Sequence, residues 1–232
     1  MAGHRPQVVF VHAARALELS ARLGLNAEGA SPAAVYPVTD RVAAKISTLE
    51  TPPDVMAVFP LPESRALTTL RGATGQALVV FADGIGDPGN MGTLLRAAVA
   101  FGATALCSAP GSADLYGPKT VRAGMGAVFG LPLYPDLRLA DLHAVLPEAA
   151  VYGLAAHDGL PLAGAAFRRP AVLAVGAERL GLSPEALAHV TQLVTIPLVP
   201  GLPGGVESLN AGVAGAIALY EFSRRPAAPA KG

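Results

Sequence analysis

The chain has 232 residues, of which 52% are hydrophobic, 15% are charged and none is Trp. This composition supplies enough apolar side chains for a packed core and excludes global disorder, while the length suits one large domain or two smaller ones. The 17 Lys and Arg residues balance the 17 Asp and Glu residues, so the net charge gives no sign of a nucleic-acid or membrane partner. Any such partner must be argued from local sites.

Two sequence features bear on the cellular compartment. The single cysteine, Cys107, excludes an intramolecular disulfide, and its apolar neighbours predict a small buried core residue. The amino terminus lacks the apolar stretch of a signal peptide, and no segment approaches the roughly 18 uninterrupted apolar residues of a membrane span. A cytoplasmic protein without membrane contact is therefore expected.

Residues 1–70 are expected to form a small α/β domain. The sequence pattern changes at residues 61–75, a polar stretch that contains Pro and Gly. Asp40 is a candidate N-cap for the second of its helices. Hydrophobic patterning predicts strands over 8–11, 34–38 and 55–59 and helices over 13–23 and 40–49.

From residue 76 onward, short continuous apolar runs alternate with helical stretches, and the runs cover 77–82, 103–107, 150–154, 171–175 and 193–196. Continuous hydrophobicity means burial on both faces, which is typical of parallel strands covered by helices. A last helix over 207–222 is small and apolar on nearly every side, so we expect the sheet and a second subunit to cover it. Residues 224–232 are expected to form a flexible tail.

A glycine pattern after the first of these strands suggests a dinucleotide site, because Gly84, Gly86 and Gly89 match G-x-G-x-x-G in a strand-to-helix context. However, Asp87 would place a negative charge beside a pyrophosphate, and Pro88 removes a backbone N–H that should bind it. The acidic residue expected about 20 residues later is also missing. The sequence therefore argues against this site.

Three polar segments are better candidates for chemistry. The first runs from Asn90, a candidate N-cap, to Arg96; the second is Gly176–Gly181; the third follows Ile196 and covers 207–210. Each alone has an ordinary structural explanation as a cap or a turn. All three, however, lie just beyond the carboxyl ends of predicted parallel strands, where open α/β sheets bind ligands. We expect them to form one site.

In their order and spacing, these segments resemble the SpoU (TrmH-like) branch of the SPOUT RNA methyltransferases. The resemblance covers about residues 76–223 and includes two intermediate segments, 116–119 and 121–126. The matching positions are Asp83, Asn90, Gly92, Arg96, Ala97, Gly102, Gly176, Glu178, Gly181, Ile196, Pro197, Ser208, Leu209 and Asn210.

The resemblance implies an α/β fold with a parallel-sheet methyltransferase domain over 76–223, whose carboxyl end is threaded into a trefoil knot. It also implies 2′-O-methylation of an RNA ribose with S-adenosylmethionine as cofactor, without a metal, and a homodimer. The knotted loops would hold the cofactor in a bent form, largely through backbone groups. By position these loops would contribute Leu154, Gly176, Ile196, Leu198 and Leu209.

Within this resemblance, Arg96 is the expected principal catalytic residue, because a guanidinium can grip an RNA phosphate while directing an N–H at the 2′-oxygen. Arginine stays protonated at neutral pH, so electrostatic alignment is preferred; a general base assisted by bound phosphate is the alternative. Asn90, Ser208 and Asn210 would place the ribose and the arginine through hydrogen bonds. Glu178 would anchor Arg96 or a neighbouring loop.

The RNA partner is less defined. Lys119 and Arg122 are candidate phosphate contacts, although ordinary surface charge explains them as well. Residues 1–70, best over 38–58, resemble the small L30e-like RNA-binding domain of ribosomal RNA methyltransferases in this family. The basic opening portion of that domain has no counterpart here, so a shortened domain or a misassigned start is expected. This domain favours ribosomal (23S) RNA over transfer RNA.

Two alternatives come from other classes of protein. A knotted RNA-binding protein without catalysis is disfavoured by the intact set of candidate catalytic residues. A hydrolase would use Ser208 with His157 and Asp158, but Ser208 lacks a nucleophile-elbow context. The sequence leaves open which nucleotide is methylated, and whether the enzyme is housekeeping or confers antibiotic resistance.

Overall fold

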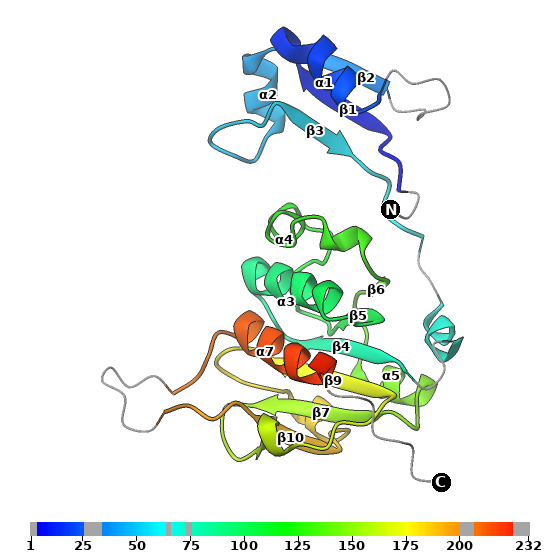
Figure 1. Ribbon diagram of the computed structural model, residues 1–232, viewed down its shortest axis with the longest axis vertical. Coiled ribbons are helices and arrows are strands. Elements are labelled where there is room, and N and C mark those ends of the chain that lie inside the picture. Colours follow the sequence, from blue (N-terminus) through cyan, green and yellow to red (C-terminus); the bar gives the residue numbers. More distant parts are fainter. Residues whose placement is uncertain (1–3, 26–33, 64–65, 73–75, 200–206, 225–232) are drawn as a thin grey trace. The chain divides into compact units, whose positions relative to one another are not determined.

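The computed structural model describes residues 4–25, 34–63, 66–72, 76–199 and 207–224. The chain divides into two compact units, Met1–Glu63 and Ser64–Gly232, whose elements are labelled in Figure 1. Within the described ranges, no helix combines the length and the apolar character needed to cross a bilayer.

The first unit is a three-stranded sheet in the order β2-β1-β3. Strand β1 (Val8–His12) pairs in parallel with β2 (Ala34–Val38) and antiparallel with β3 (Val55–Val58). Helix α1 (Ala16–Arg22) follows a 3-10 turn, η1 (Ala13–Arg15), and α2 (Asp40–Ile46) follows β2. Its core is formed by Val9, Val11 and Leu19. The predicted order of strands and helices in this region is confirmed.

The predicted N-cap at Asp40 is wrong. Thr39 occupies the N-cap position, without a capping hydrogen bond from its side chain, and Asp40 is the first helical residue. The Asp40 carboxylate instead lies 2.9 Å from Nε2 of His12 at the end of β1. The Asp40 carboxylate therefore pairs with His12, which is distant in the sequence, and does not cap α2.

The second unit is a seven-stranded sheet in the order β6-β5-β4-β9-β7-β10-β8, and every neighbouring pair is parallel. The five predicted apolar runs are confirmed as β4, β5, β7, β9 and β10. Strands β6 and β8 were missed because two residues each are too few to show a pattern. The bounds are β4 Leu78–Asp83, β5 Ala105–Ser108, β6 Leu133–Tyr134, β7 Ala150–Ala155, β8 Leu160–Pro161, β9 Ala171–Gly176 and β10 Gln192–Thr195.

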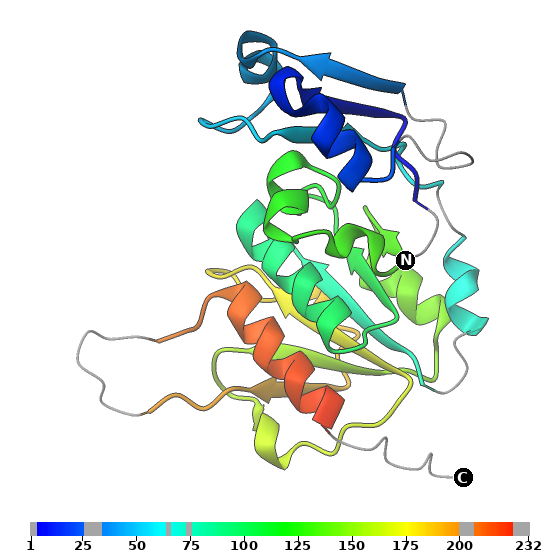
Figure 2. The same ribbon diagram turned by 45° about the horizontal axis from the view of Figure 1, so that its top comes forward.

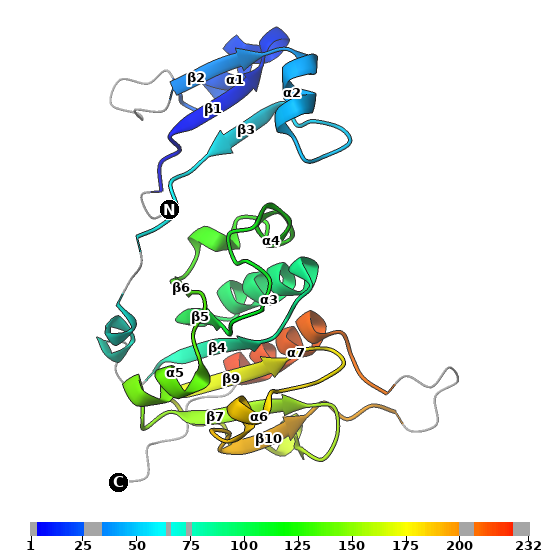
Figure 3. The same ribbon diagram turned by 180° about the vertical axis from the view of Figure 1, so that it is seen from behind.

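Helices cover both faces of this sheet. One face of β4, with Leu78 and Val80, packs in a core with α3 (Pro88–Ala100) and α7 (Ala211–Arg224), which lie together in Figure 2. The other face, with Val79 and Phe81, packs against α5 (Leu139–Val145) and α6 (Pro184–Leu187), seen in front of the sheet in Figure 3. Burial on both faces is the physical reason for the continuous apolar runs. The short helices η3 (Ala127–Phe129) and η4 (Leu162–Gly164) complete the unit.

Glycines allow α3 to lie close to the helices on either side of it. A Cβ on Gly212 of α7 would stand 2.9 Å from the carbonyl oxygen of Asn90, and one on Gly215 would stand 2.5 Å from Leu94. Toward α4 (Pro118–Ala123), a Cβ on Gly92 would stand 2.7 Å from the carbonyl oxygen of Thr120. The small residues of the last helix are thus explained in part by its close contact with α3.

Two helix starts differ from the prediction. Asp87, not Asn90, is the N-cap of α3, because its carboxylate accepts from the backbone N–H of Asn90 and Pro88 occupies the first turn. The last helix begins at Ala211 rather than at residue 207, and it extends to Arg224. The remainder of the predicted tail lies outside the described residues.

The polar stretch 61–75 contains secondary structure of its own. Residues Leu67–Gly72 form a 3-10 helix, η2, that belongs to the second unit. Leu70 is buried there, and the Thr69 hydroxyl lies 2.8 Å from the Tyr134 hydroxyl. The local polarity of this stretch did not reveal these tertiary contacts; its residues 64–65 and 73–75 lie outside the described part of the chain.

Candidate functional site

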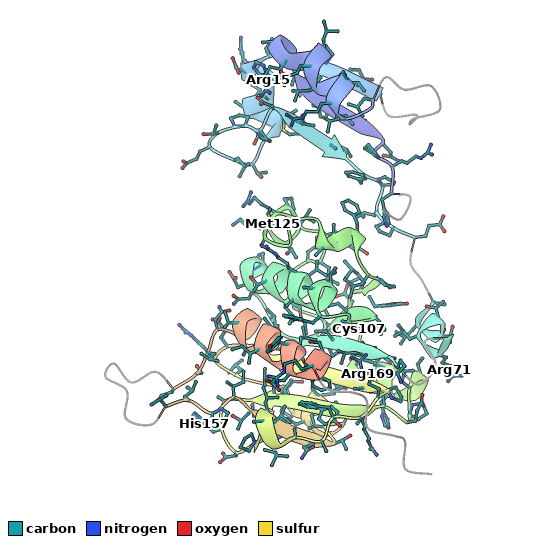
Figure 4. All side chains as sticks on the ribbon, viewed as in Figure 1. Arg15, Arg71, Cys107, Met125, His157 and Arg169 are labelled. Carbon is teal, nitrogen blue, oxygen red and sulfur yellow. The ribbon has the colours of Figure 1, made fainter. Side chains whose placement is uncertain are left out.

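A pocket of about 340 Å³ opens at the carboxyl ends of β7, β9 and β10 and at the start of α7. His157, on the loop after β7, marks this end of the sheet in Figure 4. The pocket brings together all five residues expected to hold the cofactor, along with Glu178 and Ser208. Its lining residues are Leu154, Ala155, Ala156, His157, Val175, Gly176, Ala177, Glu178, Arg179, Leu180, Gly181, Ile196, Leu198, Ser208, Leu209, Ala211 and Ala214.

One wall of the pocket is a tight turn after β9, here called the β9 loop (residues 177–183). Ala177 and Gly181 exchange two backbone hydrogen bonds, of 3.0 and 2.8 Å. Gly181 has a φ of 66°, and a Cβ on Gly176 would stand only 2.2 Å from the carbonyl carbon of Gly181. Glycine is therefore required at both positions. The turn holds Glu178 and Leu180 at an exposed tip beside the pocket.

Three of the predicted catalytic residues form one hydrogen-bonded group, here called the amide–carboxylate cluster (Asn90, Glu178 and Asn210). Oε1 of Glu178 accepts from Nδ2 of Asn90 at 2.8 Å and from Nδ2 of Asn210 at 2.6 Å. Nδ2 of Asn210 also lies 2.6 Å from Oδ1 of Asn90. The cluster joins the start of α3, the β9 loop and the start of α7. It thereby ties the three sequence segments together.

Helix capping explains why both amides point into this cluster. Asp87 satisfies the backbone N–H of Asn90 at 2.8 Å, so the Asn90 side chain is free for other partners. Asn210 uses its Oδ1 to accept from the backbone N–H of Val213 at 3.1 Å, which caps α7. Its Nδ2 is then left to donate to Asn90 and Glu178. The local structure of each helix start thus orients one member of the cluster.

Arg96 is placed differently from the cluster. It is exposed on α3, does not line the pocket, and forms no hydrogen bond or ion pair with any residue that the structure describes. Glu178 has no hydrogen bond or ion pair with Arg96; its Oε1 accepts from Asn90 and Asn210 instead. Arg96 lies one helical turn after Gly92, whose face of α3 contacts α4. It is therefore on the side of α3 that faces the helix carrying Lys119 and Arg122.

Sequence reasoning missed several residues of the site. His157 and Arg179 line the pocket, whereas the sequence suggests a role for His157 only in a hydrolase. The Asp87 carboxylate caps α3, a role that the sequence does not predict for it. This carboxylate occupies the helix N-terminus, the position at which a pyrophosphate binds in dinucleotide sites. The Asp87-Pro88 pair itself was the readable signal of a helix start.

Two other groups bear on the chemistry. Cys107 is buried among core residues, as predicted, and burial raises the pKa of its thiol to about 12, so it is an unreactive core residue. Across the ranges that the structure covers, no three His, Cys, Asp or Glu side chains gather as a metal-binding group.

Comparison with known proteins links this arrangement to a family. The model of the SpoU rRNA Methylase family matches residues 77–220. The 23S rRNA (guanosine(2553)-2′-O)-methyltransferase RlmP of Bacillus subtilis is 30% identical over 188 residues, which span 81% of this chain and 71% of the relative. The mitochondrial rRNA methyltransferase 3A of Danio rerio is 29% identical over 77% of this chain, which spans about half of that relative, 51%.

A solved structure shows the same fold. The crystal structure of the SpoU methyltransferase AviRb from Streptomyces viridochromogenes, in complex with the cofactor AdoMet, matches this chain with a TM-score of 0.82 and 26% sequence identity. The match covers 96% of this chain and 83% of that one. The α/β architecture with a parallel sheet is therefore that of a known methyltransferase structure, as the sequence predicted.

Proposed function

This chain belongs to the SpoU rRNA methylase family, and from that membership we propose that it transfers a methyl group from S-adenosylmethionine to the 2′-oxygen of a ribose in RNA. One observation carries the proposal. The cavity at the carboxyl ends of β7, β9 and β10 gathers Leu154, Gly176, Ile196, Leu198 and Leu209 from four segments of the chain. Next to it, the amide–carboxylate cluster joins the three segments that carry the family resemblance.

The chemistry of the pocket suits the cofactor. Its wall combines apolar side chains, such as Leu154, Ile196 and Leu209, with the backbone of a turn that leaves no room for a Cβ at Gly176. Such a wall can enclose an adenosine moiety and bind it through backbone groups. When bound, S-adenosylmethionine supplies an electrophilic methyl group on a sulfonium, and its thioether departs as a neutral group that needs no acid.

The remaining difficulty is the nucleophile, a weakly acidic ribose hydroxyl. The site must align its oxygen and stabilise the negative charge that develops on it. Arg96 fits this task because its guanidinium is exposed and no described residue engages it. It can bind an RNA phosphate with two N–H groups and direct another toward the 2′-oxygen. We assign Arg96 to alignment and charge stabilisation, while the hydroxyl proton passes to solvent water as the O–CH3 bond forms and the S–CH3 bond breaks.

The amide–carboxylate cluster then acts as the frame for this reaction. Asn90 and Asn210 are held by Glu178, so the start of α3, which leads to Arg96, is fixed relative to the pocket wall. Ser208 lines the pocket two residues before Asn210 and is available to contact the ribose. Preorganisation of this kind lowers the cost of reaching the reactive geometry.

We propose ribosomal RNA, most specifically 23S RNA, as the substrate. The relatives from Bacillus subtilis and Danio rerio are both named rRNA methyltransferases, and the former carries a 23S designation. Lys119 and Arg122, exposed on α4, would contact phosphates on the side of α3 that carries Arg96. Transfer RNA is the alternative substrate, and a knotted RNA-binding protein without catalysis is the alternative function.

Three further expectations remain proposals: the trefoil knot, the homodimer and the L30e-like character of the first unit. The return of α7 from β10 to pack on α3, β7 and β9 supports a threaded carboxyl end. Val213, Ile217 and Tyr220 leave an apolar stripe on α7 exposed by 44%, 37% and 47%, which supports a covering second subunit. The cytoplasmic location stays a prediction.

Two measurements test the proposed function. Ribose methylation is mapped across total RNA from cells with and without this protein, and we expect one ribosomal site to lose its 2′-O-methyl group. Calorimetry with the purified full chain should show saturable binding of S-adenosylmethionine. Binding without any change in the methylation map would favour a non-catalytic protein, whereas a lost site in transfer RNA would replace the substrate and keep the chemistry.

A further inference from the structure

Asp83 is a buried carboxylate that the proposed chemistry does not use. It ends β4, is only 7% exposed, and is one of the few buried charged or polar residues in the described part of the chain. Burying a carboxylate is costly unless hydrogen bonds compensate for its lost hydration. Its Oδ2 accepts the backbone N–H of Ser183 at 2.6 Å, across a separation of 100 residues. This short contact gives the buried carboxylate a specific partner.

The partner, Ser183, lies at the base of the β9 loop. Asp83 stands opposite Gly176 in the parallel pairing of β4 with β9, so the carboxylate lies beside the strand end from which the loop departs. The loop then turns back, held by the two Ala177–Gly181 hydrogen bonds, and reaches Ser183. There the backbone N–H of Ser183 donates to the Asp83 carboxylate. Both ends of the loop are thus fixed against the end of β4.

The segment held in this way carries much of the pocket wall. Residues 177–181 all line the cavity, and Glu178 within them holds the amide–carboxylate cluster. Asp83 itself does not line the cavity. Its effect on a ligand must therefore pass through the position of the loop.

We propose that Asp83 is a positioning residue for the cofactor, which fixes the β9 loop through the Ser183 backbone in the geometry that binds S-adenosylmethionine. This inference rests on the proposed function. Ser183 has a separate task, because its Oγ accepts from the backbone N–H of Ala186 and caps α6. Since Asp83 uses the backbone and α6 uses the hydroxyl, the two tasks can be separated by substitution.

The test compares Asp83→Ala with Ser183→Ala in the full chain. Asp83→Ala removes the acceptor from the Ser183 N–H, and we expect the dissociation constant for S-adenosylmethionine, measured by calorimetry, to rise about tenfold or more, in line with a lost charge-assisted hydrogen bond. Ser183→Ala keeps that bond and removes only the cap, so its dissociation constant should rise clearly less than that of Asp83→Ala. Asp83→Asn keeps a weaker neutral acceptor and should fall between Asp83→Ala and wild type, at about threefold.

Hydrogen exchange supplies a readout that a general loss of stability would not produce. In Asp83→Ala, the Ser183 amide should lose protection while amides of β4 and β9 keep theirs. Should this variant not fold, Asp83→Asn carries the test with the same two measurements. Wild-type affinity in a folded Asp83 variant, or protection lost equally across the sheet, would overturn the proposal. Failure of the wild-type protein to bind S-adenosylmethionine would instead overturn the proposed function.

Discussion

Two parts of one helix, α3 (Pro88–Ala100), use their polar side chains in opposite ways. At its start, Asn90 is bonded through its backbone to Asp87 and through its side chain to Glu178 and Asn210. Nearly two turns later, Arg96 is exposed and has no partner among the described residues. The amide–carboxylate cluster at the start of the helix is a frame whose polar groups bond to one another. The Arg96 guanidinium, in contrast, is available to a substrate. This difference predicts that substitutions in the two regions affect different measurements.

The largest effect is expected at Arg96. Arg96→Ala removes the group that stabilises developing charge, so the rate of methyl transfer should fall by about 10²- to 10³-fold. Because Arg96 forms no hydrogen bond or ion pair with the described residues and does not line the pocket, the melting temperature and the affinity for S-adenosylmethionine should stay near wild type. A tritium-transfer assay measures the rate, and Arg96→Lys, which keeps the charge without the planar fork, is the matched control. Turnover within a few-fold of wild type would remove Arg96 from its assigned role.

A smaller effect on rate, joined to a loss of stability, is expected at Glu178. Glu178→Ala leaves Nδ2 of Asn90 and of Asn210 without their shared acceptor. Since Asn210 is exposed to water and Asn90 is only half-buried, stability should fall by only about 0.5–1.5 kcal/mol and the rate by about 10- to 100-fold. Glu178→Gln restores a neutral acceptor and should recover part of both losses. The measurements are thermal unfolding and tritium transfer. An alanine variant as stable and active as wild type would mean that the cluster is not a frame.

A substitution at Gly176, which lies in the pocket wall, is expected to lower the affinity for the cofactor. Gly176→Ala forces a Cβ to within 2.2 Å of the Gly181 carbonyl carbon, so the β9 loop must shift, and we expect the affinity for S-adenosylmethionine to weaken by about tenfold or more. Gly164→Ala is the control, because a Cβ there meets nothing within 4 Å. Calorimetry on both variants decides the matter. Equal affinities would show that the turn is not a binding wall.

The smallest effect is expected at Lys119, which is exposed on α4. Lys119→Ala should raise the KM for RNA by about two- to fivefold and leave kcat unchanged, because a phosphate contact adds binding without chemistry. The slope of log affinity against log salt should fall by about 0.7 to 1. Binding titrations at several salt concentrations measure this slope. An unchanged slope would mark Lys119 as ordinary surface charge.

The same comparison explains what the sequence could and could not predict. Apolar runs such as 77–82 and 171–175 are long enough to predict strands that are buried on both faces. The structure has β4 and β9 at these positions. The helix starts were harder, since Asn90 and Asp87 both suit an N-cap and only Pro88 distinguishes them. Likewise, 207–210 have the polarity of a first helical turn, but Asn210 caps a helix that starts after it.

The frame itself could be expected only from the family resemblance. Its hydrogen bonds join residues separated by 88 and 120 positions, and no local pattern specifies such a distance. The resemblance named Asn90, Glu178 and Asn210, yet their mutual bonding emerges only once three strand ends and two helix starts are assembled. The bond from Asp83 to Ser183 is of the same kind and was not expected at all.

The most direct test of the central claim follows the methyl group to its oxygen. The purified full chain is incubated with tritiated S-adenosylmethionine and with ribosomal RNA from cells that lack this protein, and the labelled RNA is then hydrolysed in alkali. A 2′-O-methyl group blocks cleavage of the adjacent phosphodiester, so the account predicts that the label appears in alkali-resistant dinucleotides, and that Arg96→Ala transfers almost none. Label found only in mononucleotides, which would place the methyl group on a base, or no label in any RNA, would contradict the account.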